Sequence, residues 1–398
     1  MEQPMKQPPM PIQLSSRLHG IGEYYFSTKL REIDELNRQG KAIINLGIGS
    51  PDQPPHPSVI EALQDGAGKS TSHGYQNYKG IPALREAMAL WYLRSYGVTL
   101  DPAAEILPLM GSKEGILHIC MTYLQSGDEA LIPNPGYPTY RSAVTLAGAT
   151  PVEYELSEQR NWGPDWEALE KTDLSRVKIM WVNYPHMPTG QNANPALFQQ
   201  LIDFGRRHRI LICHDNPYSF ILNDRPQSIL SSPGAMEIAL ELNSLSKSHN
   251  MAGWRVGMLS GAADRINEVL RFKSNMDSGM FLPVQMAAIA ALQLDQSWYD
   301  QVNATYAARR TLAIELLSCI GCHPAPDQSG LFLWAKIPAT SQDAFQLTDR
   351  ILYQANVFLT PGGIFGSAGN QYVRISLCAT EAKMEEAIQR IKIHGSGN

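Results

Sequence analysis

The feature that most constrains the fold is a regular alternation of short apolar runs and longer amphipathic stretches between residues 114 and 242. The apolar runs have the length and composition of buried strands, and the amphipathic stretches have helical periodicity. Strands separated by helices form βαβ units, which join into a mostly parallel sheet with helices on both faces. We therefore predict an α/β fold with a three-layer α/β/α domain, with strands at 129–133, 178–183, 210–214 and 237–242 and helices at 114–124 and 195–207.

The two ends of the chain follow a different pattern. A long helical region at 283–317 precedes strands at 331–336 and 372–377 and helices at 342–354 and 381–393, which predicts a smaller α+β domain. A chain of 398 residues usually forms more than one domain. We expect a Pro- and Gln-rich N-terminal arm at 1–16, a small domain from 17–46 and 286–398, and a large domain at 47–285.

The composition excludes several classes of protein. With 33 Lys plus Arg and 38 Asp plus Glu, the formal charge is −5, and the absence of a basic stripe argues against nucleic acid as a partner. We find no secretory signal and no apolar run long enough for a membrane span, so we expect a cytoplasmic protein. The 5 cysteines are expected to be reduced. Cys319 and Cys322 form a lone C-x-x-C pair, which we interpret as chance spacing, and we expect no metal site.

The most informative segment is NSLSKSHNMAGWRVG, residues 243–257. It follows a predicted strand and contains Ser244, Ser246, Lys247 and Arg255. Burial or a cationic neighbour lowers the pKa of such a lysine, so that its free amine can form a Schiff base. The serine hydroxyls and the guanidinium are suitable donors for a phosphate. The segment therefore indicates either a site for a phosphate-bearing carbonyl cofactor or a surface lysine in a polar loop.

The S-x-S-K and G-x-R-x-G runs of this segment resemble the lysine segment of the class I/II aminotransferases of fold type I. The resemblance extends from about Ile21 to the last predicted helix. It implies that Lys247 binds pyridoxal 5'-phosphate and that the enzyme moves an amino group from an L-amino acid to a 2-oxo acid by a ping-pong mechanism. Lys247 would then serve as base and acid in turn. A lyase that carries out C–S β-elimination on the same fold stays the alternative.

Further residues match the family's pattern in the middle of the chain. Asp215 and Tyr218 lie in HDNPY just after a strand, where ligands bind in open α/β sheets. The resemblance implies that Asp215 pairs with the pyridine nitrogen, that Tyr218 bonds the ring phenolate and that Tyr137 of NPGYPTY stacks on the ring. Arg374 lies in the apolar strand YVRISLC, where an unpaired charge would be unfavourable, and the family uses this arginine to bind the substrate carboxylate.

The remaining expected contacts involve phosphate, substrate and a second subunit. Ser112 and Lys113 of GSKEGI start a predicted helix, whose N-terminus favours an anion. By the resemblance, Gly49 leaves room for the substrate carboxylate. The resemblance also implies that Tyr75 reaches the partner's cofactor phosphate, so we expect a homodimer with shared active sites. Tyr24 is a candidate for substrate contact.

One position departs from the family's pattern. The family has Asn in an N-P-T-G motif, where it bonds the cofactor phenolate, whereas this chain has Met187 in NYPHMPTG. Methionine cannot donate that hydrogen bond, so Tyr218 acts alone or Asn183 or His186 compensates. The sequence leaves the amino donor open. Three residues are possible readers of a second substrate carboxylate, namely Lys29, Arg31 and Arg271.

Overall fold

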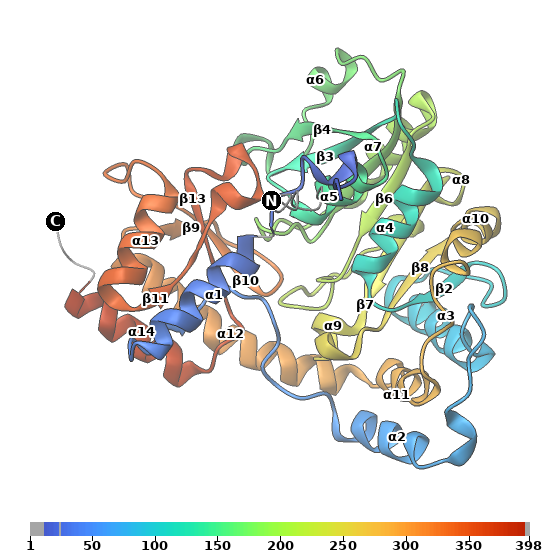
Figure 1. Cartoon of the computed structure of the whole chain (residues 1–398), viewed down its shortest axis with the longest axis horizontal. Helices are drawn as coiled ribbons and strands as arrows, with labels where there is room; N and C mark the ends of the chain where they lie inside the picture. Colours follow the sequence, from blue (N-terminus) through green and yellow to red (C-terminus); the bar gives the residue numbers. More distant parts are fainter. Residues whose placement is uncertain (1–11, 24, 395–398) are drawn as a thin grey trace, which may run out of the picture.

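The structure is a computed structural model, and it describes residues 12–23 and 25–394. A seven-stranded sheet forms its centre, with strand order β2-β8-β7-β6-β5-β3-β4 (Figure 1). The run from β7 to β4 is parallel, whereas β8 is antiparallel to both of its neighbours. The strands are β2 (Ile106–Leu109), β3 (Glu129–Asn134), β4 (Thr150–Glu155), β5 (Val177–Asn183), β6 (Leu211–Asp215), β7 (Ala239–Ser244) and β8 (Gly257–Gly261).

Helices cover both faces of this sheet because successive strand side chains point to opposite sides. In β5, Ile179 and Trp181 join the apolar cluster formed with α4 (Ser112–Tyr123), α5 (Pro138–Leu146) and α10 (Ala263–Lys273). Met180 and Val182 join the larger core on the other face, which includes α7 (Pro195–His208). The predicted α/β fold with a mostly parallel sheet is confirmed.

The remaining strands form two smaller sheets. A four-stranded sheet has the order β12-β13-β10-β9, and a two-stranded parallel sheet pairs β1 with β11. These strands are β1 (Ile44–Asn45), β9 (His323–Pro324), β10 (Phe332–Lys336), β11 (Val357–Phe358), β12 (Thr360–Pro361) and β13 (Tyr372–Ser376). The pairing of β1 with β11 brings the N-terminal part of the chain to its C-terminal part. The exact domain boundaries stay a prediction.

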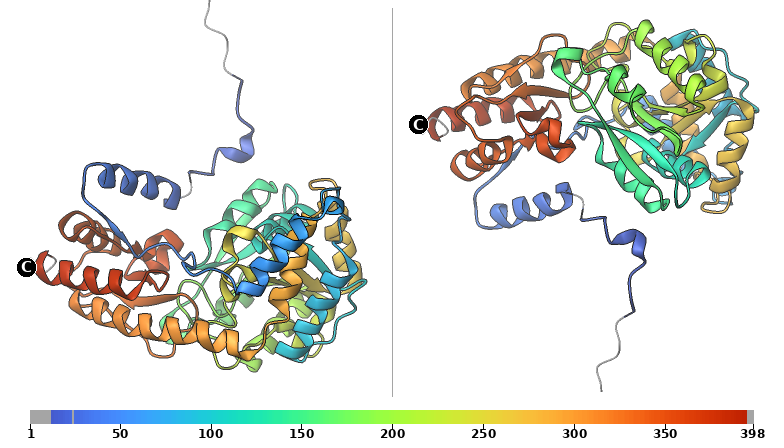
Figure 2. Two further views of the ribbon diagram at one scale, coloured as in Figure 1. Left: turned by 90° about the horizontal axis from the view of Figure 1, so that it is seen from below. Right: turned by 90° about the horizontal axis from the view of Figure 1, so that it is seen from above.

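The remaining helices connect and cover these sheets. Helix α12 runs from the large sheet toward the C-terminal part, and α1 lies against α13 in the views of Figures 1 and 2. These helices are α1 (Tyr25–Arg38), α2 (Pro57–Ala67), α3 (Pro82–Tyr96), α6 (Trp166–Glu170), α8 (Ala235–Ile238), α9 (Leu245–Ser248), α11 (Leu282–Leu292), α12 (Gln296–Cys319), α13 (Ala344–Ala355) and α14 (Glu381–His394). Across the described ranges, no helix combines the length and the apolarity that a bilayer crossing requires.

Two predicted elements are corrected. The strand predicted at 237–242 starts later, because α8 ends at Ile238 and β7 runs from Ala239 to Ser244. The helical region predicted at 283–317 is two helices, α11 and α12, and the Asp295 carboxylate caps the start of the second by accepting from the Ser297 N–H. Propensity alone does not reveal such a break, since the residues on both sides are good helix formers.

Candidate active site

A cavity of about 610 Å³ lies where β5, β6 and β7 end. The carboxyl ends of parallel strands lie at one edge of a sheet, so the residues that follow them come together in space. The sequence-predicted residues that line this cavity are Gly49, Ser112, Lys113, Tyr137, Asn183, Asp215, Tyr218, Ser244, Ser246, Lys247, Arg255 and Arg374.

Lys247 extends from the short helix α9 into the cavity. Its Nζ donates a hydrogen bond to the carbonyl oxygen of Gly49 at 2.6 Å. Burial lowers the pKa of Lys247 below its ordinary value, and the positive charges of Arg374 and Arg255 lower it further, although Cys378 acts in the opposite direction. An amine with a lowered pKa is more often neutral near pH 7, and a neutral amine is the form that attacks a carbonyl.

Asp215 lies at the end of β6 and is 4% exposed. Its Oδ2 accepts a hydrogen bond from the Tyr140 hydroxyl at 2.9 Å, whereas its Oδ1 is buried and has no hydrogen-bond partner. Burial raises the pKa of Asp215 to about 6, although the Tyr140 hydrogen bond and the nearby His214 partly oppose this rise. A buried carboxylate oxygen without a donor is unfavourable, so this atom indicates a donor or a cation supplied by a ligand.

A group of hydrogen-bond donors also lines the cavity, and we call Ser112, Lys113, Ser244, Ser246 and Arg255 the anion cradle. Ser112 opens α4, whose first backbone N–H groups have no partner within the helix. The Ser244 and Ser246 hydroxyl oxygens are 2.8 Å apart. Burial and the neighbouring Arg255 both lower the pKa of Lys113. Hydroxyls, a helix N-terminus and two cations at one place are suited to a phosphate.

Two glycines allow the segments that carry the cradle to pack closely against one another. A Cβ on Gly111 would lie 2.1 Å from Arg255 Nη2, and the φ of 90° at this residue also disfavours any side chain. A Cβ on Gly257 would lie 2.6 Å from the backbone nitrogen of Ser112. The backbone therefore approaches closely enough that only glycine fits at either position.

Arg374 lies in the middle of β13, opposite Trp334 of β10 and Thr360 of β12. Although 4% exposed, it lines the cavity, and its Nη2 donates to the carbonyl oxygen of Gly47 at 2.8 Å. Its guanidinium carbon is 3.8 Å from the centre of the Phe332 ring. The strand pairing thus places a fixed cation at the end of the cavity that is lined by aromatic rings.

Met187 is buried beside this arginine, where its Sδ is 3.3 Å from Arg374 Nη1. Of the two residues expected to compensate for the missing asparagine, Asn183 lines the cavity and His186 does not. The Asn183 side chain donates to the Asp215 carbonyl oxygen at 2.6 Å and accepts from the Met187 N–H at 2.7 Å. His186 is instead bonded to Thr189, and burial lowers its pKa to about 3.

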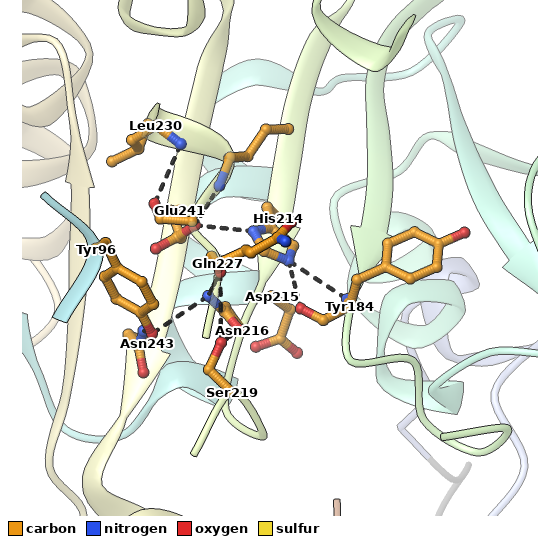
Figure 3. Close-up of polar contacts among 12 residues, drawn as sticks. Tyr96, Tyr184, His214, Asp215, Asn216, Ser219, Gln227, Leu230, Glu241 and Asn243 are labelled. Atoms are coloured by element: carbon orange, nitrogen blue, oxygen red, sulfur yellow. Dashed lines mark hydrogen bonds and ion pairs between the residues drawn. The ribbon is translucent and has the colours of Figure 1, made fainter. Parts of the chain in front are cut away.

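A buried polar network that the sequence reasoning missed lies behind Asp215 (Figure 3). His214 Nδ1 is 2.8 Å from Glu241 Oε2, and His214 Nε2 is 2.8 Å from the carbonyl oxygen of Tyr184. The same Nε2 is 3.3 Å from the Tyr184 backbone nitrogen. The same Glu241 oxygen accepts from the Ser228 hydroxyl at 2.8 Å. The network joins Tyr184, which follows β5, to strands β6 and β7. The sequence signal for it is one ionisable residue in each of two apolar strands, His214 in β6 and Glu241 in β7.

Several expected residues lie elsewhere. Tyr75 is 95% exposed and does not line the cavity, and Tyr24 lies outside the described residues. Arg271 also does not line the cavity, while Lys29 pairs with Glu32 and Asp349 and Arg31 pairs with Glu23. Cys319 and Cys322 are free cysteines away from the cavity.

The cavity also contains residues to which the sequence reasoning gave no role. Tyr140 is part of the NPGYPTY motif, but its bond to Asp215 depends on the stacking of its ring on Trp181, with ring centres 5.1 Å apart. Six apolar lining residues, four of which contact Arg374, form what we define as the apolar wall, namely Phe26, Leu30, Ile48, Met187, Phe332 and Phe365. Ser27, Pro217 and Ala252 also line the cavity. No local motif marks this wall, because its members come from distant segments.

Comparison with known proteins adds to this geometry. Residues 41–391 match the family model described as aminotransferase class I and II. The chain is 39% identical over 382 residues to the LL-diaminopimelate aminotransferase of Dehalococcoides mccartyi, covering 96% of this chain and 98% of that relative. It is also 39% identical over 383 residues to the LL-diaminopimelate aminotransferase of Moorella thermoacetica, with the same coverage.

Solved structures agree with these relatives. The apo structure of BacF from Bacillus subtilis is 36% identical, with a TM-score of 0.92 and coverage of 96% of this chain and 98% of that one. A mutant of Thermus thermophilus aspartate aminotransferase is 25% identical, with a TM-score of 0.88 and coverage of 96% and 100%.

Proposed function

Because the chain belongs to the class I and II aminotransferases and is an aminotransferase, we propose that it moves the amino group of an L-amino acid to a 2-oxo acid with pyridoxal 5'-phosphate held at Lys247. The comparisons do not favour the C–S lyase considered from the sequence. The observation that carries the cofactor assignment is the buried Asp215 Oδ1, which has no hydrogen-bond partner. A protonated pyridine nitrogen is a cationic donor of the kind that this oxygen lacks.

The other residues of the cavity fit the same cofactor. The anion cradle offers hydroxyls, two cations and a helix N-terminus for the phosphate, and Gly111 and Gly257 let Arg255 and the start of α4 pack closely together there. Lys247 is a buried amine with a lowered pKa. We assign Tyr137 to the face of the ring, and Tyr218 and Asn183 to its polar edge, because all three line the cavity beside Asp215.

Pyridoxal phosphate supplies an aldehyde that takes up amino groups and a ring that withdraws electrons from the substrate Cα. Around it, the chain's own residues bind and move protons. Arg374 binds the substrate carboxylate and thereby orients the Cα–H bond. The Lys247 amine removes the proton from Cα and returns it one position along, acting as base and then as acid, while the Asp215 carboxylate stabilises positive charge on the ring nitrogen.

We also propose a homodimer with shared active sites. Tyr75 is 95% exposed although it is a large aromatic residue, and its loop is held to α10 by the bond from Lys273 Nζ to the Tyr78 carbonyl oxygen at 3.2 Å. An exposed aromatic on an anchored loop is suited to a contact with a second subunit. Light scattering measures whether wild type and Tyr75→Ala are dimers, and titration measures the affinity of each for the cofactor. Together these measurements test the proposed homodimer with shared active sites.

The curated relatives are named for LL-diaminopimelate, so this compound belongs in the first set of amino donors to test. The experiment compares wild type, Lys247→Ala and the exposed-surface control Lys178→Ala, each incubated with pyridoxal phosphate, a panel of L-amino acids and a 2-oxo acid. We expect wild type and the control to show a visible absorption band and amino transfer. In Lys247→Ala the band should be absent and kcat should be at least about 10³-fold lower. Normal turnover of Lys247→Ala would overturn the proposed function.

A further inference from the structure

The chemistry of the cavity near Arg374 identifies a substrate class. We propose that the specific amino acid of this enzyme has an apolar or aromatic side chain, and that a donor with a second charged group, such as LL-diaminopimelate, is disfavoured. This inference rests on the proposed function, since it assumes that Arg374 binds the α-carboxylate and Lys247 lies at the reacting carbon. It departs from the substrate for which the relatives are named.

The charged side chains that line the cavity within the described residues are all assigned to other tasks. They are Lys113, Asp215, Lys247, Arg255 and Arg374. Lys113 and Arg255 lie in the anion cradle, next to one another. Asp215 is the single carboxylate among them, and the Tyr140 hydroxyl holds one of its oxygens. A second substrate ammonium or carboxylate therefore meets no opposite charge from this part of the chain.

The nearest cations on the covering helix α1 have other partners. Lys29 Nζ is 2.8 Å from Glu32 and 3.4 Å from Asp349, and Arg31 makes an ion pair with Glu23. Lys29 and Arg31 do not line the cavity, whereas Phe26 and Leu30 of the same helix do. Helix α1 thus presents Phe26, Leu30 and the uncharged Ser27 to the cavity, while Lys29 and Arg31 pair with carboxylates outside it.

The space around Arg374 is bounded by apolar groups. Its guanidinium carbon lies 3.8 Å from the ring centre of Phe332, 4.7 Å from that of Phe365 and 5.5 Å from that of Phe26. The Met187 Sδ lies on the same arginine, at the position where the family has an amide. The Phe332 ring also fills the space beside Gly49, because a Cβ there would meet it at 2.1 Å.

This arrangement favours one substrate class on physical grounds. An apolar side chain gains from leaving water against the wall, whereas a charged one loses its hydration without a counter-ion. Methionine and aromatic rings also make favourable contacts with aromatic substrates. Met187 stands where the family has a polar amide, so this replacement makes the wall more apolar and also favours an apolar substrate side chain.

The test uses the holoenzyme and follows the first half of the reaction by the visible band, with no acceptor present. We expect kcat/KM for L-phenylalanine, L-leucine or L-methionine to exceed that for LL-diaminopimelate by at least about tenfold. Calorimetry on the same protein provides a readout without turnover, and we expect 3-phenylpropionate to bind more tightly than glutarate. A preference for LL-diaminopimelate and for glutarate would overturn the inference while leaving the proposed function in place.

A pair of variants at one position sharpens the test. Leu30→Arg places a guanidinium on the wall, and Leu30→Gln is its matched polar control without charge, at a site that is 37% exposed and so tolerant of change. Leu30→Arg should raise the ratio of kcat/KM for L-glutamate to that for L-phenylalanine about tenfold over Leu30→Gln. An unchanged ratio would show that the wall does not contact the substrate side chain, which overturns the inference. No half-reaction with any donor would instead count against the proposed function.

Discussion

The two ends of the cavity are built in different ways. The anion cradle comes from two short stretches, residues 112–113 and 244–255, and its donors are hydroxyls, two cations and a helix N-terminus. The Arg374 end comes from segments spread between Phe26 and Arg374, and apolar side chains dominate it. The first is suited to a phosphate that is the same in every turnover, and the second is suited to selecting among substrates. Changes at the cradle should therefore affect all donors alike, and changes at the wall should alter selectivity.

The largest effect is expected from Asp215→Ala, on the cofactor side of this comparison. If the proposed function holds, this change removes the charge that keeps a proton on the cofactor ring, so kcat should fall about 10²–10³-fold. Because Asp215 lies away from the substrate side chain, the loss should be equal for apolar and charged donors. Steady-state kinetics with several donors measure this, with Asp300→Ala on the exposed face of α12 as control. A loss restricted to one donor would contradict the division between the two ends.

The next effect concerns the stability of the apoenzyme. Burial raises the pKa of Asp215 from 3.8 to about 6, so the unfolded chain loses this proton at lower pH than the folded one. Below about pH 4 the group contributes nothing. As the pH rises from about 4 to about 6 it destabilises the folded state increasingly, by up to about 3 kcal/mol. Asp215→Asn has no ionisable group at this position and so lacks this destabilisation. Its free energy of unfolding should therefore exceed that of the wild type by an amount that grows between about pH 4 and pH 7. Denaturant unfolding of both apoproteins checks it, and an advantage that does not change with pH would count against an uncompensated Asp215.

A double comparison tests the two arginines directly. Arg255→Gln should weaken cofactor binding about 10–100-fold with little change in the relative KM values of donors, because it removes a charge-assisted contact of the cradle. Arg374→Gln should raise the KM of every amino acid by a similar factor and leave cofactor affinity nearly unchanged. Cofactor titration and kinetics on both variants separate these effects. If both variants lost the same property, the two ends would not be independent.

The smallest effect is expected from Tyr140→Phe, which removes one hydroxyl from the floor of the cavity. The hydrogen bond from Tyr140 lowers the pKa of Asp215, so its loss should raise that pKa further. We expect kcat to fall about two- to tenfold, equally for all donors, and the acidic limb of its pH profile to move upward. A change in donor selectivity without a shift of the pH profile would place Tyr140 at the substrate end instead.

The parts that sequence reasoning predicted depend on local order. The strand and helix alternation gave the α/β fold, since periodicity is a property of neighbouring residues. The segment around Lys247 predicted four cavity residues together, Ser244, Ser246, Lys247 and Arg255, because they are close neighbours in the sequence. The errors of the sequence-based prediction were also local. The residue pattern does not reveal that β7 starts after Ile238 or that α11 and α12 are separate helices.

By itself, therefore, the sequence determined the fold class, the family and the residues of the anion cradle. Only the tertiary structure decided that Met187, Phe332 and Phe365 surround Arg374 and that Lys29 and Arg31 are held away from the cavity. The physical reason is distance along the chain. A hydrogen bond within a short loop follows from spacing, whereas the apolar wall forms only after β10, β13 and α1 have packed around one cation.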